Sequence, residues 1–207
     1  ACASGRGAVK VEHGRRIMVT SSLPGEGKTF CAINLAMSIA AERDHSVMLI
    51  DADVVRPSAM KALGVSAERG LMDWLLGDVA DVHELVIGTN VRRLTLLPAG
   101  RRHELATELL ASGKMERMLD ALSQAYPNRI LMFDAPPLLA ATEAQALAAH
   151  MGQIVLVVEA GRTLRGTVEE SLSLLKSGQN VNLLLNKARG HVGTAQYGYR
   201  AGGDGQR

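Results

Sequence analysis

The chain has 207 residues, of which 47% are hydrophobic and 21% are charged, and its net charge at pH 7 is +2. This composition is ordinary for a globular protein, and the length suits one domain with a tail. The small charge argues against a nucleic acid or an acidic substrate as partner. No apolar run approaches the roughly 20 residues of a membrane span, and we expect no signal peptide. Because the chain has only two cysteines, we expect a reducing compartment.

The chain divides into three parts by its composition. Residues 1–15 are rich in Gly, Ala and charge without any period, which predicts a flexible lead-in. Residues 16–187 carry the periodic patterns of an ordered domain. Residues 188–207 are Gly-rich and polar, which predicts a flexible tail; it contains Tyr197 and Tyr199.

Residues 16–29, RIMVTSSLPGEGKT, open the ordered domain with a phosphate-binding pattern. The apolar residues 17–19 predict a strand, and the segment from Lys28 to about residue 43 predicts a helix. Strand, glycine loop, Lys-Thr and helix form the arrangement of a phosphate-binding loop. The sequence departs from G-x-x-x-x-G-K-[ST] at the first position, which is Ser22.

The residue types in this loop suit the binding of a nucleotide with Mg²⁺. Gly25 and Gly27 let backbone N–H groups approach phosphate oxygens, and the helix N-terminus adds further donors. We expect Lys28 to bind the β- and γ-phosphates and the Thr29 hydroxyl to ligate Mg²⁺.

Strands and helices alternate through the rest of the ordered domain. Apolar runs predict strands at residues 46–53, 93–97, 129–134, 153–159 and 181–186. Helical spacing predicts helices at residues 58–63 and 69–79, a pair over 103–125 that is interrupted at 112–113, and further helices at 142–150 and 163–177. We therefore expect an α/β fold with a mostly parallel sheet and helices on both faces. Ligands bind such sheets at the carboxyl ends of the strands.

Three carboxylates end two of these strands. Asp134 follows four apolar residues, which is the pattern of the carboxylate that holds Mg²⁺ beside a phosphate loop. Asp51 and Asp53 end another strand, where period two predicts that both side chains lie on the same side. Two carboxylates can serve the metal and one can deprotonate an attacking group. The alternative is that Asp51 and Asp53 are only strand-end turn residues.

Asn186 and Lys187 end the last predicted strand, at a position where phosphate-loop proteins contact the base. Guanine-binding proteins use Asn-Lys-x-Asp, whereas this chain has Arg189 at the fourth position. The sequence therefore favours adenine over guanine. The alternative is that Asn186 is an ordinary strand-end residue.

Three segments, SSLPGEGKT, VMLIDADVVRP and ILMFDAPP, resemble the bacterial tyrosine kinases, which are built on a phosphate loop. The resemblance extends over residues 16–186, and LPAGRR and LLNKARG are similar to autokinases encoded beside exopolysaccharide and exosortase systems. It implies a P-loop NTPase-like fold and transfer of phosphoryl from ATP, with Mg²⁺, to protein tyrosine.

The resemblance also implies roles for single residues. Asp51 is expected to activate the tyrosine hydroxyl, and Tyr197 and Tyr199 are expected to be phosphorylated between neighbouring subunits. The implied catalytic residues are Lys28, Asp51, Asp53 and Asp134, and the implied metal ligands are Thr29, Asp51 and Asp134. The implied ATP-binding residues are Pro24, Gly25, Glu26, Gly27, Lys28, Thr29, Phe30 and Asn186.

The family implies further partners. We expect a homo-oligomer in the cytoplasm, recruited to the inner face of the plasma membrane by a transmembrane activator of the polysaccharide co-polymerase type, with no nucleic acid. Members that form rings often use an N-terminal helix with a Glu and spaced arginines, whereas Glu12, Arg15 and Arg16 form no convincing version.

Two alternatives to a kinase remain at this point. The fold is shared with ATPases that position septa or partition DNA, the MinD and ParA type, which act as ATP-switched dimers. Those ATPases carry a signature lysine two residues before the first loop glycine, where this chain has Leu23. The other alternative is a catalytically weak ATP-binding regulator of polysaccharide export.

Overall fold

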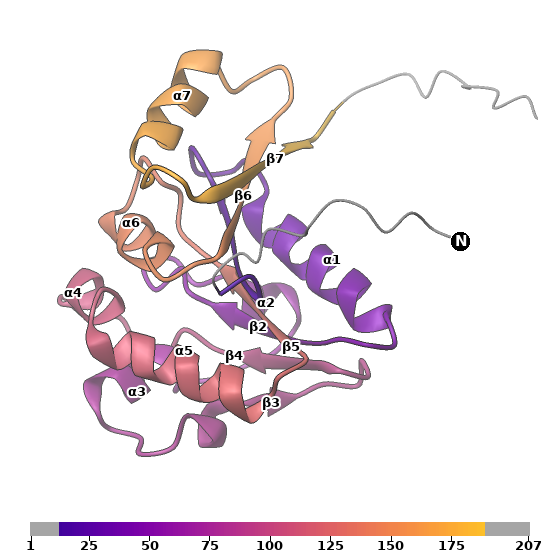
Figure 1. Ribbon diagram of the computed structural model, residues 1–207, viewed down its shortest axis with the longest axis vertical. Coiled ribbons are helices and arrows are strands. Elements are labelled where there is room, and N and C mark those ends of the chain that lie inside the picture. Colours follow the sequence, from indigo (N-terminus) through magenta and orange to yellow (C-terminus); the bar gives the residue numbers. More distant parts are fainter. Residues whose placement is uncertain (1–12, 189–207) are drawn as a thin grey trace, which may run out of the picture.

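The computed structural model describes residues 13–188 and contains a seven-stranded sheet in the order β3-β4-β2-β5-β1-β6-β7 (Figure 1). All neighbouring strands are parallel except β3 and β4, which are antiparallel. The strands are β1 (Arg16–Ser21), β2 (Ser46–Asp51), β3 (Ile87–Gly88), β4 (Leu94–Leu97), β5 (Arg129–Asp134), β6 (Gln153–Glu159) and β7 (Asn180–Asn186).

Helices cover both faces of this sheet. They are α1 (Lys28–Ala41), α2 (Ala59–Ala62), α3 (Leu71–Leu76), the 3₁₀-helix η1 (Val82–Leu85), α4 (Ala106–Leu110), α5 (Gly113–Ala125), α6 (Thr142–Ala148) and α7 (Arg165–Ser173). One apolar cluster joins a sheet face to α1 and α2, and another joins the opposite face to α3, α4, α5 and α6. The predicted α/β fold with helices on both faces is confirmed.

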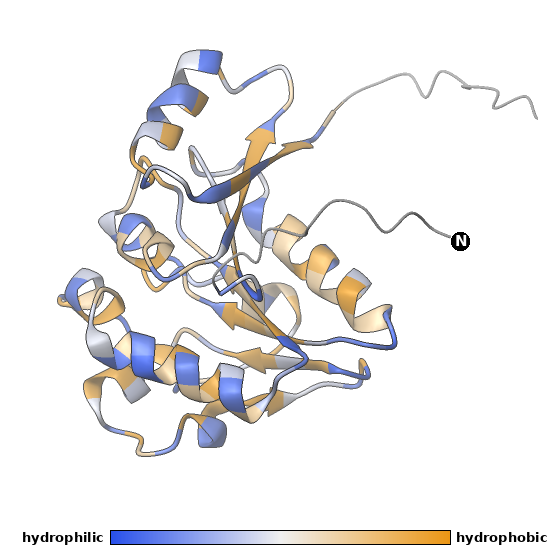
Figure 2. Cartoon of the chain, viewed as in Figure 1, coloured by the Kyte–Doolittle hydropathy of each residue, from blue (hydrophilic) through white to orange (hydrophobic). Residues whose placement is uncertain are grey.

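The central strands are apolar along most of their length because alternate side chains point to opposite faces of the sheet and both faces are covered by helices. In β2, Met48 and Ile50 belong to the cluster with α3 and α5, whereas Val47 and Leu49 belong to the cluster with α1. Successive side chains of a strand point to opposite faces, so a strand covered on both sides is apolar throughout. Figure 2 shows these hydrophobic strands in the centre of the fold, with hydrophilic residues along the outward side of α5.

The predicted pair of helices at residues 103–125 is confirmed as α4 and α5. The break falls at Ser112, whose side-chain hydroxyl accepts a hydrogen bond from the backbone N–H of Met115 and so caps α5. Within residues 13–188, no helix has the length and apolar character that crossing a membrane requires.

The prediction that the second strand reaches residue 53 is wrong, because β2 ends at Asp51. The Asp51 carboxylate accepts the backbone N–H groups of Ser58 and Ala59, at 3.1 and 2.9 Å. The Asp53 carboxylate accepts the N–H of Arg56 at 2.9 Å. These bonds fold the chain into a turn, so the period of a strand does not relate Asp51 to Asp53.

The residue that precedes the short helix α2, Ser58, does not cap it with its side chain. The Ser58 side chain makes no capping bond at the start of α2, and Asp51 accepts the exposed N–H groups instead. The cap therefore comes from β2, which sequence position alone does not indicate.

Candidate active site

The phosphate-binding loop joins the carboxyl end of β1 to the N-terminus of α1. Gly25 and Gly27 have φ angles of 87° and 98°, a region that glycine enters at little cost. A Cβ atom at Gly27 would lie 2.2 Å from Asn186 Nδ2, so a larger residue there would displace the Asn186 side chain. Gly27 is also the N-cap of α1, and no side chain caps this helix. Its first N–H groups are therefore available to a phosphate.

Glu26 holds the loop together from inside. Its side chain is buried; Oε2 accepts the backbone N–H of Leu23 at 2.8 Å, and Oε1 accepts the hydroxyl of Thr163. Both carboxylate oxygens are thus engaged within the protein. The contact of Glu26 with ATP stays a prediction, and the engaged carboxylate leaves the Glu26 backbone as the group available for it.

The ends of β6 and β7 anchor the same loop. Asn186 Nδ2 donates to the backbone carbonyl of Glu26 at 2.8 Å, and Lys187 Nζ donates to that of Gly25 at 2.6 Å. Lys187 also pairs with Glu159 at 3.1 Å. Asn186 therefore positions the loop, a role that the sequence did not indicate, and its contact with the adenine base stays a prediction. The predicted nucleotide contact Phe30 lies in the first turn of α1 with 64% of its surface exposed.

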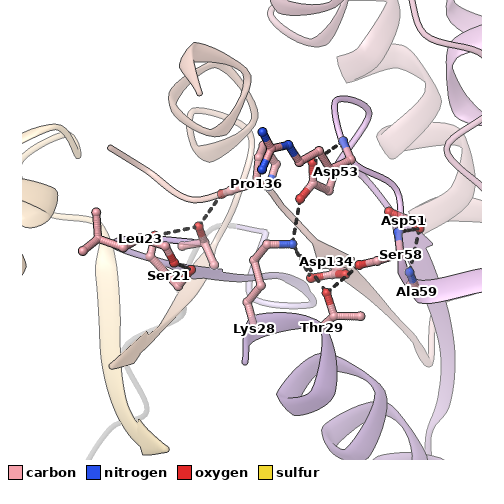
Figure 3. A network of polar contacts seen from close by, with 12 residues as sticks. Ser21, Leu23, Lys28, Thr29, Asp51, Asp53, Ser58, Ala59, Asp134 and Pro136 are labelled. Atoms are coloured by element: carbon pink, nitrogen blue, oxygen red, sulfur yellow. Dashed lines mark hydrogen bonds and ion pairs between the residues drawn. The ribbon is translucent and has the colours of Figure 1, made fainter. Parts of the chain in front are cut away.

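Lys28 lies at the centre of a polar network formed by α1, β5 and the turn after β2 (Figure 3). Its Nζ pairs with Asp53 Oδ2 at 2.8 Å and with Asp134 Oδ1 at 3.4 Å. The neighbouring Thr29 hydroxyl lies 3.0 Å from the hydroxyl of Ser58. The structure thus brings together the lysine and the carboxylates that the sequence predicted.

Burial and mutual repulsion change the proton affinity of these groups. Burial, with the charge of Asp134 beside it, raises the pKa of Asp51 to about 6. Burial also raises the pKa of Asp134, although the charge of Lys28 opposes this shift. Burial alone would lower the pKa of Lys28, but Asp134 and Asp53 outweigh it and raise that pKa, which keeps Lys28 charged.

Two carboxylate oxygens in this network fit a divalent cation. Asp51 and Asp134 lie directly opposite each other on β2 and β5, and Asp51 Oδ1 and Asp134 Oδ2 are buried with no hydrogen-bond partner among residues 13–188. Unpaired buried carboxylate oxygens are costly, and a bound cation would satisfy them. The same described residues contain no group of three His, Cys, Asp or Glu arranged to hold a metal. Mg²⁺ commonly binds through one or two carboxylates together with substrate phosphates and water, and Asp51 and Asp134 supply two carboxylates.

A cavity of about 450 Å³ opens beside the loop, and we call it the nucleotide cavity. Arg56, for which the sequence indicates no role, lies in its wall. The lining consists of loop, turn and post-β5 residues: Pro24, Gly25, Gly27, Lys28, Thr29, Asp53, Val55, Arg56, Ser58, Pro136, Pro137, Ala140 and Ala141.

Comparison with known proteins identifies the family. The model of a family described as "AAA domain" matches residues 14–185. The tyrosine-protein kinase CpsD of Streptococcus agalactiae is 32% identical over 183 residues, which cover 86% of this chain and 77% of CpsD. The tyrosine-protein kinase YwqD of Bacillus subtilis is 33% identical over 166 residues, which cover 79% of this chain and 68% of YwqD. This chain belongs to the bacterial tyrosine kinases.

Solved structures agree with this assignment. The kinase domain of the Escherichia coli tyrosine kinase ETK has a TM-score of 0.76 and 28% identity, covering 91% of this chain and 74% of that domain. The septum site-determining protein MinD from Pyrococcus horikoshii, complexed with Mg-ADP, has a TM-score of 0.64 at 21% identity, a likeness that concerns the fold alone. The fold of this bacterial tyrosine kinase is therefore P-loop NTPase-like, as predicted.

Proposed function

We propose that this protein-tyrosine kinase transfers the γ-phosphoryl group of ATP to Tyr197 and Tyr199 in the tail of a neighbouring subunit. The observation that carries the proposal is the pair of acidic side chains, Asp53 and Asp134, that contact Lys28 beside the phosphate loop, with the buried Asp51 opposite Asp134 on the neighbouring strand. Simple nucleotide binding needs fewer acids. Tyr197 and Tyr199 lie outside the described residues, so their part rests on the sequence.

Lys28 has two sets of partners in this mechanism. Without nucleotide its charge is balanced by Asp53 and Asp134. With ATP in the nucleotide cavity, Lys28 turns to the β- and γ-phosphates and the loop N–H groups hold the remaining oxygens. Asp53 then keeps Lys28 in position.

Thr29, Asp51 and Asp134 are the residues that would hold Mg²⁺. The ion, when bound, neutralises the charge that develops on the phosphate oxygens. The partnerless oxygens of Asp51 and Asp134 support this assignment, since both are acceptors without a proton donor. The nearby Ser58 hydroxyl orients Thr29.

Asp51 is the residue that we assign to accept the tyrosine proton. The new bond joins the phenol oxygen to the γ-phosphorus, the bond from that phosphorus to the β,γ-bridging oxygen breaks, and the phenol proton moves to Asp51. An exposed tyrosine has a pKa of about 10, so a base assists the loss of its proton.

The partners of the kinase are proposed from its relatives. The putative tyrosine-protein kinase EpsB of Ralstonia nicotianae is 30% identical, and the chain spans only 24% of its length. The succinoglycan biosynthesis transport protein ExoP of Rhizobium meliloti is 31% identical, and the chain spans 22% of it. We propose that a transmembrane activator recruits this kinase to the inner face of the plasma membrane for exopolysaccharide synthesis. In a homo-oligomer, the tail of each subunit would reach the active site of a neighbour. Phosphate charges on the tails would then repel one another and weaken the contacts between subunits.

The likeness to MinD keeps one other function open, that of an ATP-driven assembly switch without tyrosine phosphorylation. Leu23 argues against this function, because MinD- and ParA-type ATPases carry their signature lysine at this position. The backbone N–H of Leu23 is bonded to the Glu26 side chain, and 42% of the Leu23 surface is exposed.

The test is incubation of the protein with γ-labelled ATP and Mg²⁺, followed by peptide mapping. We expect label on Tyr197 and Tyr199, no label in Lys28→Met, and normal label in Lys176→Met, which replaces an exposed lysine of the α7–β7 connection. Undiminished labelling of Lys28→Met would overturn the site assignment. ATP turnover without any labelled tyrosine would favour the assembly switch.

A further inference from the structure

The two edges of the sheet differ in how well they can pair with another strand. One edge is β3, which consists only of Ile87–Gly88. The other edge is β7, which has seven residues and lies beside β6 at the end of the strand order (Figure 1). Within the described part of the chain, no strand lies beyond β7. A long strand with a free edge is a template for a further strand, whereas a two-residue strand offers little.

The free backbone groups of β7 belong to alternate residues. The backbone carbonyl of Asn186 accepts the N–H of Ala160 at 2.9 Å, so Asn186 directs its backbone groups to β6. In a parallel ladder the N–H and C=O of one residue point to the same side of the strand, and the side alternates along the chain. Val181, Leu183 and Leu185 therefore direct their N–H and C=O groups to the free edge.

The same three residues place an apolar stripe beside this edge. Their side chains share one face of the sheet because they are two positions apart. Leu183 is 60% exposed and Leu185 is 65% exposed, whereas Val181 packs partly against the core. The most exposed apolar side chains of β7 thus belong to residues whose backbone groups are free to pair.

The strand carries none of the usual features that discourage pairing at an edge. Its sequence, NVNLLLN, has no charged residue and no proline. It pairs with β6 residue by residue along its whole length, without a bulge. Proteins commonly protect an edge with lysine, proline, a bulge or a very short strand. β7 is therefore suited to a partner strand.

A second copy of β7 fits this edge in one register. Leu183 is the middle residue of β7, and antiparallel pairing centred there sets Leu183 opposite the partner's Leu183 and Leu185 opposite the partner's Val181. Every residue with outward backbone groups then exchanges both hydrogen bonds with a residue of the same kind. A shift by one residue would oppose outward groups to inward ones. A shift by two would leave one outward residue beyond the end of the partner strand.

We infer that β7 pairs antiparallel with β7 of a second copy, so that two sheets join across a two-fold axis. Each copy uses its free edge, so the assembly closes at a dimer. The inference goes beyond phosphoryl transfer and does not depend on it. Because the paired strands are antiparallel, the nucleotide cavities of the two copies face opposite ends of the joined sheet. This contact is therefore distinct from the delivery of a tail to a neighbour's site.

The contact is small in area. A standard stable interface buries about 800 Å² on each partner, and one strand edge with two exposed leucines covers less than that. Uncharged surface meets uncharged surface along the whole strand, so no charge has to lose its water when the dimer forms. We therefore expect a dimer that dissociates on dilution and is insensitive to salt.

Oxidative cross-linking of the full chain tests the register. In a Cys2→Ser background, where the remaining Cys31 is buried, Leu183→Cys would face its own copy at a Cα separation of about 5.5 Å, which a disulfide can span. Leu185→Cys is the matched control. It is equally exposed, but in this register its two copies lie about 14 Å apart along the strands. We expect at least about tenfold more disulfide-linked dimer from Leu183→Cys than from Leu185→Cys.

Sedimentation of the wild-type chain over a series of concentrations tests the association itself. Leu183→Lys sets two like charges opposite each other and should raise the dimer dissociation constant at least about tenfold. Leu105→Lys replaces a leucine that is 53% exposed at the start of α4 and should change this constant by less than about twofold. Equal cross-linking of the two cysteine variants, or an unchanged dissociation constant in Leu183→Lys, would overturn the inference. A wild-type chain that stays monomeric at every concentration would overturn it as well.

Discussion

Replacing Asp51 with asparagine should stabilise the nucleotide-free protein at neutral pH while it removes kinase activity. The pKa of Asp51 is raised from 3.8 to about 6, because the carboxylate is buried and faces the charge of Asp134. A raised pKa of a carboxyl group means that its charged form lowers the free energy of unfolding of the protein. Asparagine has a similar shape and carries no charge, so it removes this cost.

The size of the effect follows from the pKa shift. One pKa unit corresponds to about 1.36 kcal/mol, and the shift of Asp51 is the difference between about 6 and 3.8. The cost of the charge at neutral pH is therefore about 3 kcal/mol. The N–H groups of Ser58 and Ala59 both donate to Asp51 Oδ2, so the carbonyl oxygen of asparagine can accept both, but a neutral acceptor binds them less strongly than a carboxylate, which reduces the gain. We expect a net increase in the free energy of unfolding of about 1–3 kcal/mol.

The sign of the pH dependence distinguishes this account from a general packing effect. Below pH 3.8, Asp51 is protonated in both states and has no cost; the cost grows between pH 3.8 and about 6 and is complete above that. Urea unfolding of Asp51→Asn and wild type should therefore diverge as the pH rises from 4 to 7. Asp44→Asn, in the exposed turn before β2, is the control. A destabilised Asp51→Asn, or a stability difference that is the same at pH 4 and pH 7, would refute the reasoning.

Three further predictions concern nucleotide binding. Gly27→Ala should abolish ATP binding in titration calorimetry, because its Cβ would lie 2.2 Å from Asn186 Nδ2 and its φ is 98°; binding at wild-type affinity would contradict the fit. Asn186→Ala should weaken ATP binding about fivefold, as one hydrogen bond to the loop is worth about 1 kcal/mol, and unchanged affinity would show that the loop holds its shape without it. Removal of Mg²⁺ with EDTA should reduce tyrosine labelling to the level of Lys28→Met and added Mg²⁺ should restore it; labelling that persists in EDTA would show that Asp134 and Asp51 need no cation.

Patterns carried by single strands and helices predicted most of this fold. Unbroken apolar runs located the parallel strands because a strand covered on both faces has no polar positions, as Met48 and Val47 on opposite faces of β2 illustrate. The glycines and Lys28 located the phosphate loop because the positive φ angles and the helix N-terminus require those residue types at that spacing.

Interactions between distant segments were not predictable in the same way. The bond from Asn186 to the carbonyl of Glu26 joins residues 160 positions apart, and the one from Thr163 to Glu26 joins residues 137 apart. Their partners depend on how β6 and β7 lie beside β1, which no local pattern records. The early end of β2 has a more local cause, since the Asp51 side chain accepts the N–H groups of Ser58 and Ala59 in the turn that follows, and an apolar run does not indicate such bonds.

Phosphoryl transfer between subunits is tested most directly by mixing two inactive partners. One chain carries Lys28→Met and an intact tail; the other carries Tyr197→Phe with Tyr199→Phe and an intact site. With γ-labelled ATP and Mg²⁺, the account predicts label on Tyr197 and Tyr199 of the Lys28→Met chain in the mixture and on neither chain alone. Absence of label from that tail, while wild-type chains label themselves under the same conditions, would contradict transfer between subunits.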